Sequence, residues 1–246
     1  VRKCVGPNFP ISIRITSDDL MEGGNTFADT LKMLEYWDEF VDIYNVSLAL
    51  SPTLHYQLDT MDMEDGWRTH YARTVKEKFG KPCISMGNIR TPELADKLVT
   101  EGTADFIGIG RGLIADPQWA NKAYEGREAQ IRKCISCNIG CAGNRLANNR
   151  MIRCTINPDL IHDDDYKKLH VKRATNVVVI GGGTAGLEAA CSAAEVGCSV
   201  FLLEKGNELG GLAQKISTFP EKRRIRQFVD YQKCRADALK NLYIFR

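Results

Sequence analysis

The chain has 246 residues, a length that suits one or two domains. Lys and Arg number 33 and Asp and Glu number 31, and this near balance of charge argues against nucleic acid or an anionic membrane as a partner. No apolar run approaches the roughly 18 residues of a membrane span, and no signal-peptide core follows the first residue, so we expect a cytoplasmic protein.

The first 125 residues are predicted to alternate between strand and helix. We expect strands at 10–16, 41–50, 83–86 and 104–109, and helices at 27–40, 66–79 and 91–100. Short apolar strands between amphipathic helices predict an α/β fold with a parallel sheet, either half of a (β/α)8 barrel or a small open sheet. Two glycines directly after strands, Gly87 and Gly110, favour the barrel, although ordinary turns would explain them equally well.

Residues 132–154 form a cysteine-rich segment with little periodicity, which predicts a loop. Residues 157–173 are polar and include Asp163, Asp164 and Asp165, as expected of a surface linker. Residues 176–204 match a compact βαβ unit. The remainder, 205–246, is basic and helix-prone, with the run Lys222-Arg223-Arg224.

Nine cysteines stand beside only four histidines, and they cluster, which disfavours a secreted disulfide framework. The spacing C-x2-C-x3-C-x12-C joins Cys134, Cys137, Cys141 and Cys154. Four thiolates suit either zinc or an iron–sulfur cluster, and three close cysteines with one distant one favour a [4Fe–4S] cluster. Gly140 and Gly143 would let the backbone wrap closely around it. The remaining cysteines are predicted to be small apolar packing residues: Cys4, Cys83, Cys191, Cys198 and Cys234.

A glycine-rich turn follows the strand predicted at 176–180 and precedes a helix rich in small residues. Gly181 suits the tight turn, Gly183 the close approach of a pyrophosphate, and Gly186 the packing of helix on strand. Glu204 ends the next strand, where it would accept hydrogen bonds from ribose hydroxyls and disfavour a 2′-phosphate. The pattern predicts a dinucleotide site for FAD or NAD, and the pair Gly210-Gly211 resembles the second glycine pair of FAD domains.

The order of these segments resembles a known family, the iron–sulfur flavoenzymes typified by trimethylamine dehydrogenase and bacterial 2,4-dienoyl-CoA reductase. The resemblance rests on VGPNFPISIR (5–14), GNIRTP (87–92) and DFIGIGRGLIADP (105–117), on the four cysteines and on the glycine turn. It covers nearly the whole chain. It implies the second half of a (β/α)8 barrel of the old yellow enzyme type, followed by a Rossmann-like FAD or NAD(P) domain.

The resemblance implies FMN on the barrel. By position, Arg14 resembles the arginine at the flavin ring edge, where a fixed cation stabilises reduced flavin. Gly87, Asn88, Gly110 and Arg111 resemble the phosphate-binding ends of the last two barrel strands, although relatives usually have a basic residue where Asn88 stands.

The resemblance also implies an electron route. NAD(P)H would reduce FAD, the cluster would pass single electrons, and FMN would reduce the activated C=C bond of an enoyl-CoA or enoate. In the amine dehydrogenase branch, electrons leave an amine substrate through FMN and the cluster, and ADP occupies the dinucleotide fold. His55 falls roughly where the reductases place a catalytic acid, and a plain surface histidine is the alternative.

We therefore expect four segments: half of an FMN barrel (1–130), an iron–sulfur segment (131–157), a linker (158–174) and a partial FAD or NAD(P) domain (175–246). Only the second barrel half is matched, so the sequence predicts a fragment of a larger oxidoreductase with little turnover of its own. Its partner would be a small-molecule substrate, with no nucleic acid and no membrane. Two alternatives come from other classes: a non-catalytic electron-transfer or nucleotide-binding module, and a zinc-stabilised nucleotide-binding scaffold.

Overall fold

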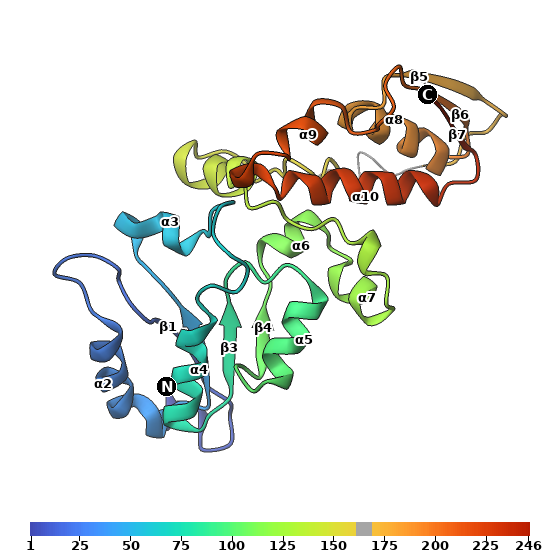
Figure 1. Cartoon of the computed structure of the whole chain (residues 1–246). Coiled ribbons are helices and arrows are strands. Elements are labelled where there is room, and N and C mark those ends of the chain that lie inside the picture. Colours follow the sequence, from blue (N-terminus) through green and yellow to red (C-terminus); the bar gives the residue numbers. More distant parts are fainter. Residues whose placement is uncertain (161–168) are drawn as a thin grey trace. The chain divides into compact units, whose positions relative to one another are not determined.

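A computed structural model of the chain describes residues 1–160 and 169–246 (Figure 1). These residues divide into two compact units, Val1–Gly110 and Arg111–Arg246. The predicted linker lies partly outside the described residues, and its three consecutive aspartates lie wholly outside them. The predicted boundaries at 130, 157 and 174 stay predictions.

The first unit is built on a four-stranded parallel sheet in the order β1-β2-β3-β4. Its strands are β1 (Ser12–Thr16), β2 (Ile43–Ser47), β3 (Cys83–Met86) and β4 (Phe106–Gly108). Its helices are α1 (Arg2–Val5), α2 (Phe27–Trp37), α3 (Leu54–Gln57), α4 (Thr69–Phe79) and α5 (Pro92–Thr100), with short 3-10 turns η1 (Asp38–Phe40) and η2 (Ser51–Thr53). Parallel strands place all their carboxyl ends at one edge, where binding residues of α/β proteins gather.

Local sequence signals explain where these helices begin and end. Thr26 and Asp29 form a capping box at the start of α2. The Thr91 side chain accepts a hydrogen bond from the backbone N–H of Leu94, which caps α5. Gly80 ends α4 in the left-handed conformation. The helix predicted at 27–40 is shorter than expected, because α2 ends at Trp37 and the next three residues form the 3-10 turn η1.

The second unit carries a three-stranded parallel sheet in the order β5-β6-β7. Its strands are β5 (Asn176–Ile180), β6 (Ser199–Leu203) and β7 (Leu242–Phe245). Its helices are α6 (Arg111–Ala115), α7 (Trp119–Tyr124), α8 (Thr184–Glu195), α9 (Gly211–Ile216) and α10 (Ile225–Asp237), with 3-10 turns η3 (Glu128–Gln130) and η5 (Pro220–Lys222) and the π-helical segment η4 (Ile139–Ala147).

Two predictions for this unit were wrong. The cysteine-rich segment is not wholly a loop, because η4 winds through it as a π-helix. The end of the chain is not only helical, because β7 pairs with β6 and adds a third strand to the sheet. β7 alternates between a buried Leu242 and an exposed Tyr243, but four residues are too few to establish a period of two from sequence.

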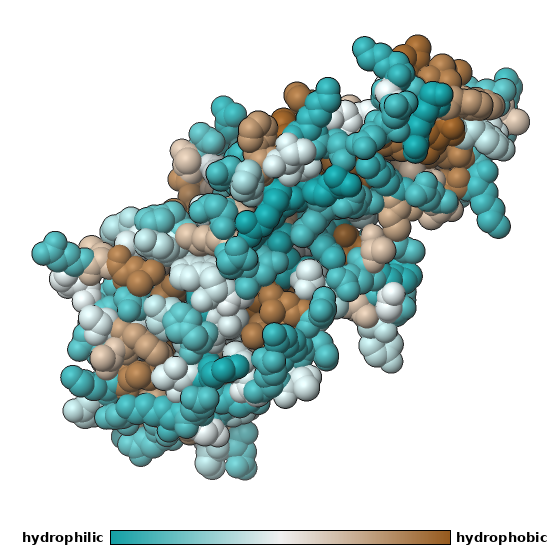
Figure 2. Space-filling model, viewed as in Figure 1, coloured by the Kyte–Doolittle hydropathy of each residue, from teal (hydrophilic) through white to brown (hydrophobic). Residues whose placement is uncertain are grey.

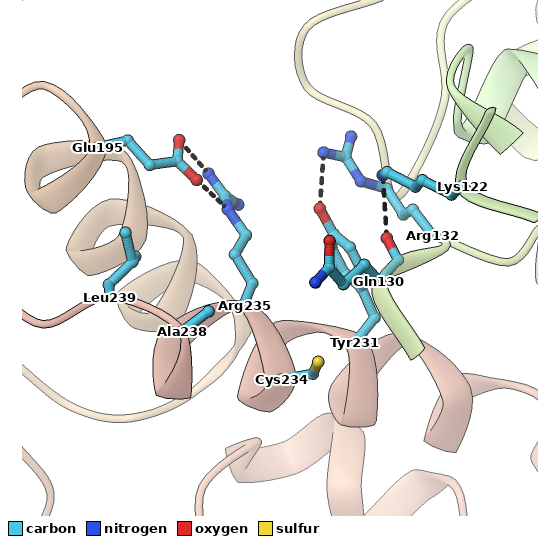
Figure 3. A pocket seen from close by; sticks show the side chains of 9 residues that line it. All are labelled: Lys122, Gln130, Arg132, Glu195, Tyr231, Cys234, Arg235, Ala238 and Leu239. Carbon is cyan, nitrogen blue, oxygen red and sulfur yellow. Dashed lines mark hydrogen bonds and ion pairs between the residues drawn. The ribbon is translucent and has the colours of Figure 1, made fainter. Parts of the chain in front are cut away.

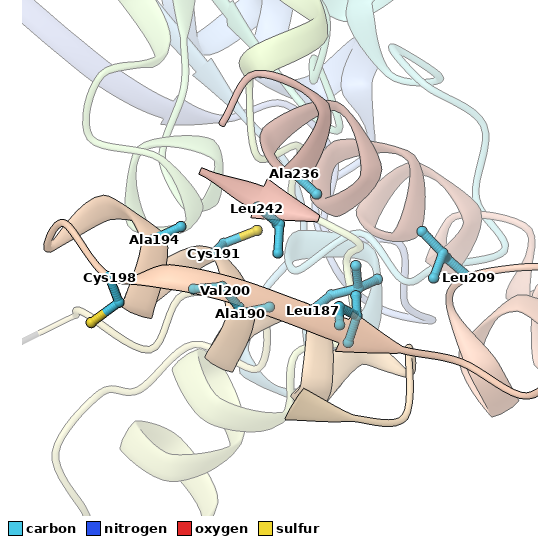
Figure 4. Packing of buried hydrophobic residues seen from close by; sticks show 10 residues of the cluster. Leu187, Ala190, Cys191, Ala194, Cys198, Val200, Leu209, Ala236 and Leu242 are labelled. Carbon is cyan, nitrogen blue, oxygen red and sulfur yellow. The ribbon is translucent and has the colours of Figure 1, made fainter. Parts of the chain in front are cut away.

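The core of the second unit lies where α8 packs on β6 (Figure 4). Leu187, Cys191 and Leu202 are almost completely buried there. Cys198 is buried in the same cluster and Cys83 in the first unit's core, as predicted for apolar packing residues. The prediction was wrong for Cys4, which is exposed, and Cys234 is only half-buried.

We expect Leu202→Ala to lower the free energy of unfolding of this unit by about 3 kcal/mol, because it leaves a cavity in a core where Leu202 is 0% exposed. Its neighbour Leu203 is 40% exposed, so Leu203→Ala should cost less than about 1 kcal/mol. Urea unfolding followed by circular dichroism measures both. Equal losses in the two variants would contradict this packing.

No helix in the described part of the chain is both long enough and apolar enough to cross a membrane. Figure 2 shows a face on which hydrophilic side chains predominate and hydrophobic ones are scattered in small groups.

Candidate functional site

The four cysteines of the predicted cluster line a single small cavity in the second unit. Cys134 and Cys137 lie on the irregular segment before η4, Cys141 lies within η4, and Cys154 lies on the segment after it. Among the described residues, no group of three or more His, Cys, Asp or Glu side chains converges on a position for one metal ion. A zinc site needs its sulfurs about 2.3 Å from one point, whereas a cubane cluster spreads its cysteines over separate irons. The four thiols around this cavity supply the donors that an iron–sulfur cluster needs, and the same four donors would also suit zinc.

Close backbone packing surrounds this cavity. A Cβ atom on Gly140 would lie 2.5 Å from the carbonyl oxygen of Arg153, so only glycine allows the two segments to pass so closely. The backbone N–H of Arg153 donates to the Gly140 carbonyl at 2.7 Å. This contact holds Cys154 beside η4, which brings the distant fourth cysteine to the other three.

Hydrogen-bonding groups lie beside two of the cysteine sulfurs. The backbone N–H of Ser136 donates to Cys134 Sγ at 3.4 Å, and Cys137 Sγ lies 3.3 Å from Thr155 Oγ1. Burial raises the pKa of the Cys134 thiol, and the Ser136 N–H and the charge of Arg111 oppose that rise. Burial is the larger effect, so the pKa of Cys134 lies above its ordinary value.

Two arginines hold the residues on either side of Cys137. Arg111 lines the cysteine cavity, and its Nη1 donates to Asn138 Oδ1 at 2.6 Å. Arg224 is 2% exposed, and its Nη1 donates to Ser136 Oγ at 2.9 Å. Sequence reasoning assigned Arg111 to an FMN phosphate and treated Arg224 only as part of a basic run. The structure places both at the cysteine segment, and nothing in sequence spacing indicates the contact of Arg224.

The glycine-rich turn joins β5 to α8 as the sequence predicts. Gly181 has a φ of +101°, and Gly183 is the N-cap residue of α8. A Cβ on Gly186 would lie 1.8 Å from the Gly181 carbonyl oxygen, so α8 starts against the turn only because Gly186 lacks a side chain. A Cβ on Gly183 would meet nothing within 4 Å. Space at Gly183 and free N–H groups at a helix N-terminus are what a pyrophosphate needs.

Glu204 braces this turn from the end of β6. Its Oε2 accepts a hydrogen bond from the N–H of Gly182 at 2.6 Å, and its Oε1 accepts one from Gly206 at 2.7 Å. These two donors lower the pKa of the Glu204 carboxyl, so it is ionised at neutral pH. Each oxygen has a second lone pair, so this bracing leaves capacity to accept ribose hydroxyls.

The second glycine pair packs against the first turn. The N–H of Gly210 donates to the Gly182 carbonyl at 2.7 Å, and Gly210 forms an isolated parallel bridge with Gly183. A Cβ on Gly211 would approach the Cα of Gly183 to 3.1 Å. The segments 181–186 and 206–211 therefore pack directly against each other.

The predicted FMN residues are distributed over strand ends. Arg14 is exposed on β1, where its Nη2 donates to Ser47 Oγ at 3.0 Å. Gly87 directly follows β3 with a φ of +121°, and Asn88 beside it is 6% exposed. Gly110, after β4, ends the first unit, and the next residue begins the second. Arg14 therefore lies within one strand of the parallel sheet, Gly87 and Gly110 follow two others, and their role toward FMN stays a prediction.

His55, the predicted catalytic acid, is exposed in α3. Its ring centroid lies 4.1 Å from that of the adjacent Tyr56. His55 therefore lies on a short helix, and its catalytic role stays a prediction.

A larger pocket of about 290 Å³ in the second unit was not predicted from sequence (Figure 3). It shares no lining residue with the cysteine cavity. Arg132 donates to the Tyr231 hydroxyl at 3.1 Å, and Arg235 forms ion pairs with Glu195 at 2.6 Å and Glu188 at 2.8 Å. These contacts fix α10 against α8 and the segment before Cys134, which gives the pocket walls a structural role.

The α/β fold, together with the residues predicted to bind flavin, nucleotide and cluster, places the chain in the class of flavin-dependent oxidoreductases. The family model for the NADH:flavin oxidoreductase / NADH oxidase family matches residues 1–130, and the chain belongs to this family. A second model, FAD dependent oxidoreductase, matches residues 176–220, which include the glycine turn.

Three similar proteins illustrate the match. NADH oxidase from Thermoanaerobacter brockii is 43% identical over 94% of this chain and 36% of its own length. Histamine dehydrogenase from Rhizobium sp. 4-9 superposes with a TM-score of 0.89 at 25% identity, over 99% of this chain and 36% of that chain. A 2-naphthoyl-CoA reductase superposes with a TM-score of 0.91 at 27% identity, over 99% and 37%. The chain thus spans about a third of the length of these proteins. The family prediction and the α/β fold resembling barrel flavoenzymes are confirmed.

Proposed function

We propose that this chain is part of an NAD(P)H-dependent flavin and iron–sulfur oxidoreductase that reduces an activated C=C bond of the enoate or enoyl-CoA type. The observation that carries the proposal is the cavity lined by all four predicted cluster cysteines, in the same compact unit as the glycine turn. A [4Fe–4S] cluster, when bound, exchanges one electron at a time and so links two flavins that exchange electrons in pairs.

Each cofactor has its proposed residues in the chain. Cys134, Cys137, Cys141 and Cys154 would hold the cluster, and Gly181, Gly183, Gly186 and Glu204 the ADP part of FAD or ADP itself. Arg14, Gly87, Asn88, Gly110 and Arg111 would hold FMN. In this proposal the four-stranded sheet is the second half of a (β/α)8 barrel, and the three-stranded sheet begins a Rossmann-like domain, whose β5-β6-β7 order suits one half of that fold.

Two chain features suit the proposed chemistry. Ionised Glu204 favours free ribose hydroxyls over a 2′-phosphate, because a second negative charge there is repelled. Arg14 presents a fixed positive charge on an exposed strand position, which would stabilise negative charge on a flavin ring bound beside it. His55 would deliver a proton to the substrate.

An amine dehydrogenase is the second candidate, because histamine dehydrogenase shares the fold over nearly the whole chain. In that reading ADP, rather than FAD, would lie on the glycine turn. A non-catalytic electron-transfer module is the third reading and predicts bound cofactors without substrate turnover.

Anaerobic reconstitution of the chain with iron, sulfide, FMN and FAD tests the proposal. We expect about four irons per chain, an absorption band near ~400 nm, and release of FAD on denaturation. One zinc and no iron would reject the cluster, and ADP without FAD would favour the amine branch. In the longer protein that carries this chain, we expect NADH-dependent reduction of an enoate or enoyl-CoA, and oxidation of an amine instead would contradict the substrate class.

A further inference from the structure

Arg224 is the largest fully buried side chain of the described residues, although it comes from the basic run Lys222-Arg223-Arg224. Lys222 and Arg223 are exposed, as expected of a solvated charge run. Moving a guanidinium out of water costs several kcal/mol unless hydrogen bonds replace the lost hydration. Its burial therefore points to a specific task for this one member of the run.

The Nη1 of Arg224 reaches Ser136 Oγ across 88 residues of sequence, at 2.9 Å. Ser136 lies between Cys134 and Cys137 and has a φ of +53°, a backbone conformation that residues other than glycine seldom adopt. A residue in this conformation persists only where surrounding contacts hold it. The hydrogen bond from Arg224 is one such contact.

The other side of Cys137 has the same arrangement. Asn138 has a φ of +56°, and Arg111 donates to its side-chain oxygen at 2.6 Å. Arg111 also lines the cysteine cavity. Cys137 is therefore flanked by two left-handed residues, and each is held by an arginine from a distant part of the chain.

We propose that Arg111 and Arg224, here called the arginine clamp, are positioning residues that fix the cysteine segment for its cluster and make that cluster easier to reduce. The proposal rests on the cluster assigned under the proposed function. One-electron reduction adds a negative charge to the cluster, with no bond formed or broken, and the electron comes from the external reductant. A fixed positive charge on the cavity lining, which Arg111 supplies, stabilises the reduced state more than the oxidised state, and hydrogen bonding around the site, to which Arg224 contributes through Ser136, acts in the same direction.

The test is a double-mutant cycle on the iron-loaded chain. Arg224→Met removes the donor, Ser136→Ala removes the acceptor, and Arg224→Lys keeps a charged donor. The midpoint potential is measured by dithionite titration followed by electron paramagnetic resonance. Arg226→Met is the matched control, because Arg226 is exposed and forms a surface ion pair with Asp230 of the same helix.

We expect Arg224→Met and Ser136→Ala to shift the potential downward, and the double variant to shift it by less than the sum of the two. Arg224→Lys should keep most of the midpoint potential of the unaltered chain. Arg111→Met should also lower the potential, and Arg226→Met should leave it unchanged. Iron lost from Arg224→Met but kept by Arg224→Lys would also support the clamp.

An unchanged potential and spectrum in Arg224→Met, additive shifts in the cycle, or iron lost from Arg224→Met and Arg224→Lys alike would each overturn the proposal. If the unaltered chain itself takes up no iron, the proposed cluster fails and the clamp fails with it. If only the clamp is wrong, the unaltered chain still takes up its full complement of iron. Failure of the clamp and failure of the cluster can therefore be distinguished.

Discussion

Replacing Cys141 by Ala should reduce iron in the reconstituted chain from about four per chain to less than about one, with loss of the band near ~400 nm. The same result is expected for Cys134, Cys137 and Cys154, because all four line one cavity and each would supply one thiolate. Iron and zinc counts by atomic absorption, together with the visible spectrum, measure the effect.

Cys4→Ser is the matched control for this experiment. Cys4 is exposed and belongs to the first unit, so its loss should leave the iron content unchanged. A full iron complement in Cys141→Ala would remove that residue from the ligand set. A zinc content that falls in all four variants, in a chain without iron, would assign the cavity to zinc.

Replacing Gly186 by Ala should prevent the second unit from folding normally, at a cost of at least about 3 kcal/mol. The added Cβ would lie 1.8 Å from the carbonyl oxygen of Gly181, which is backbone and cannot rotate away. Thermal unfolding followed by circular dichroism measures the loss, and binding of ADP by calorimetry should disappear with it.

Gly183→Ala separates folding from binding at the same turn. Gly183 has a φ of −73°, which alanine adopts readily, and an added Cβ would meet nothing within 4 Å. This variant should fold with an almost unchanged melting temperature but bind ADP at least about tenfold more weakly, because the methyl group would occupy the space proposed for the pyrophosphate. Unchanged ADP affinity in Gly183→Ala would place the nucleotide elsewhere.

Much of this organisation could be predicted from local patterns. The alternation of short apolar strands and amphipathic helices indicated the parallel sheets, because side-chain periodicity reports burial directly. The spacing of Cys134, Cys137 and Cys141 and the glycines after β5 are dense local motifs, and they identified residues that the structure gathers at one cavity and one turn.

Features that depend on distant partners could not be predicted in this way. Arg224 carries the same charge as its exposed neighbours, and only the folded chain distinguishes it. β7 depends on pairing with β6, and the π-helical winding of η4 has no periodic signature in nine residues. Glu204 likewise accepts hydrogen bonds from Gly182 and Gly206 only once the turn has closed. Its position at the end of a strand does not indicate these contacts.

The contact between Arg224 and Ser136 also orders events during biosynthesis. The ribosome adds Ser136 88 residues before it adds Arg224. A nascent chain that has just exposed its four thiols therefore lacks one of the two arginines that hold them. Under the proposed function, an assembly system that delivers iron and sulfide would meet a preorganised site only after the second unit has been translated and folded, so insertion of the cluster would follow synthesis of this unit.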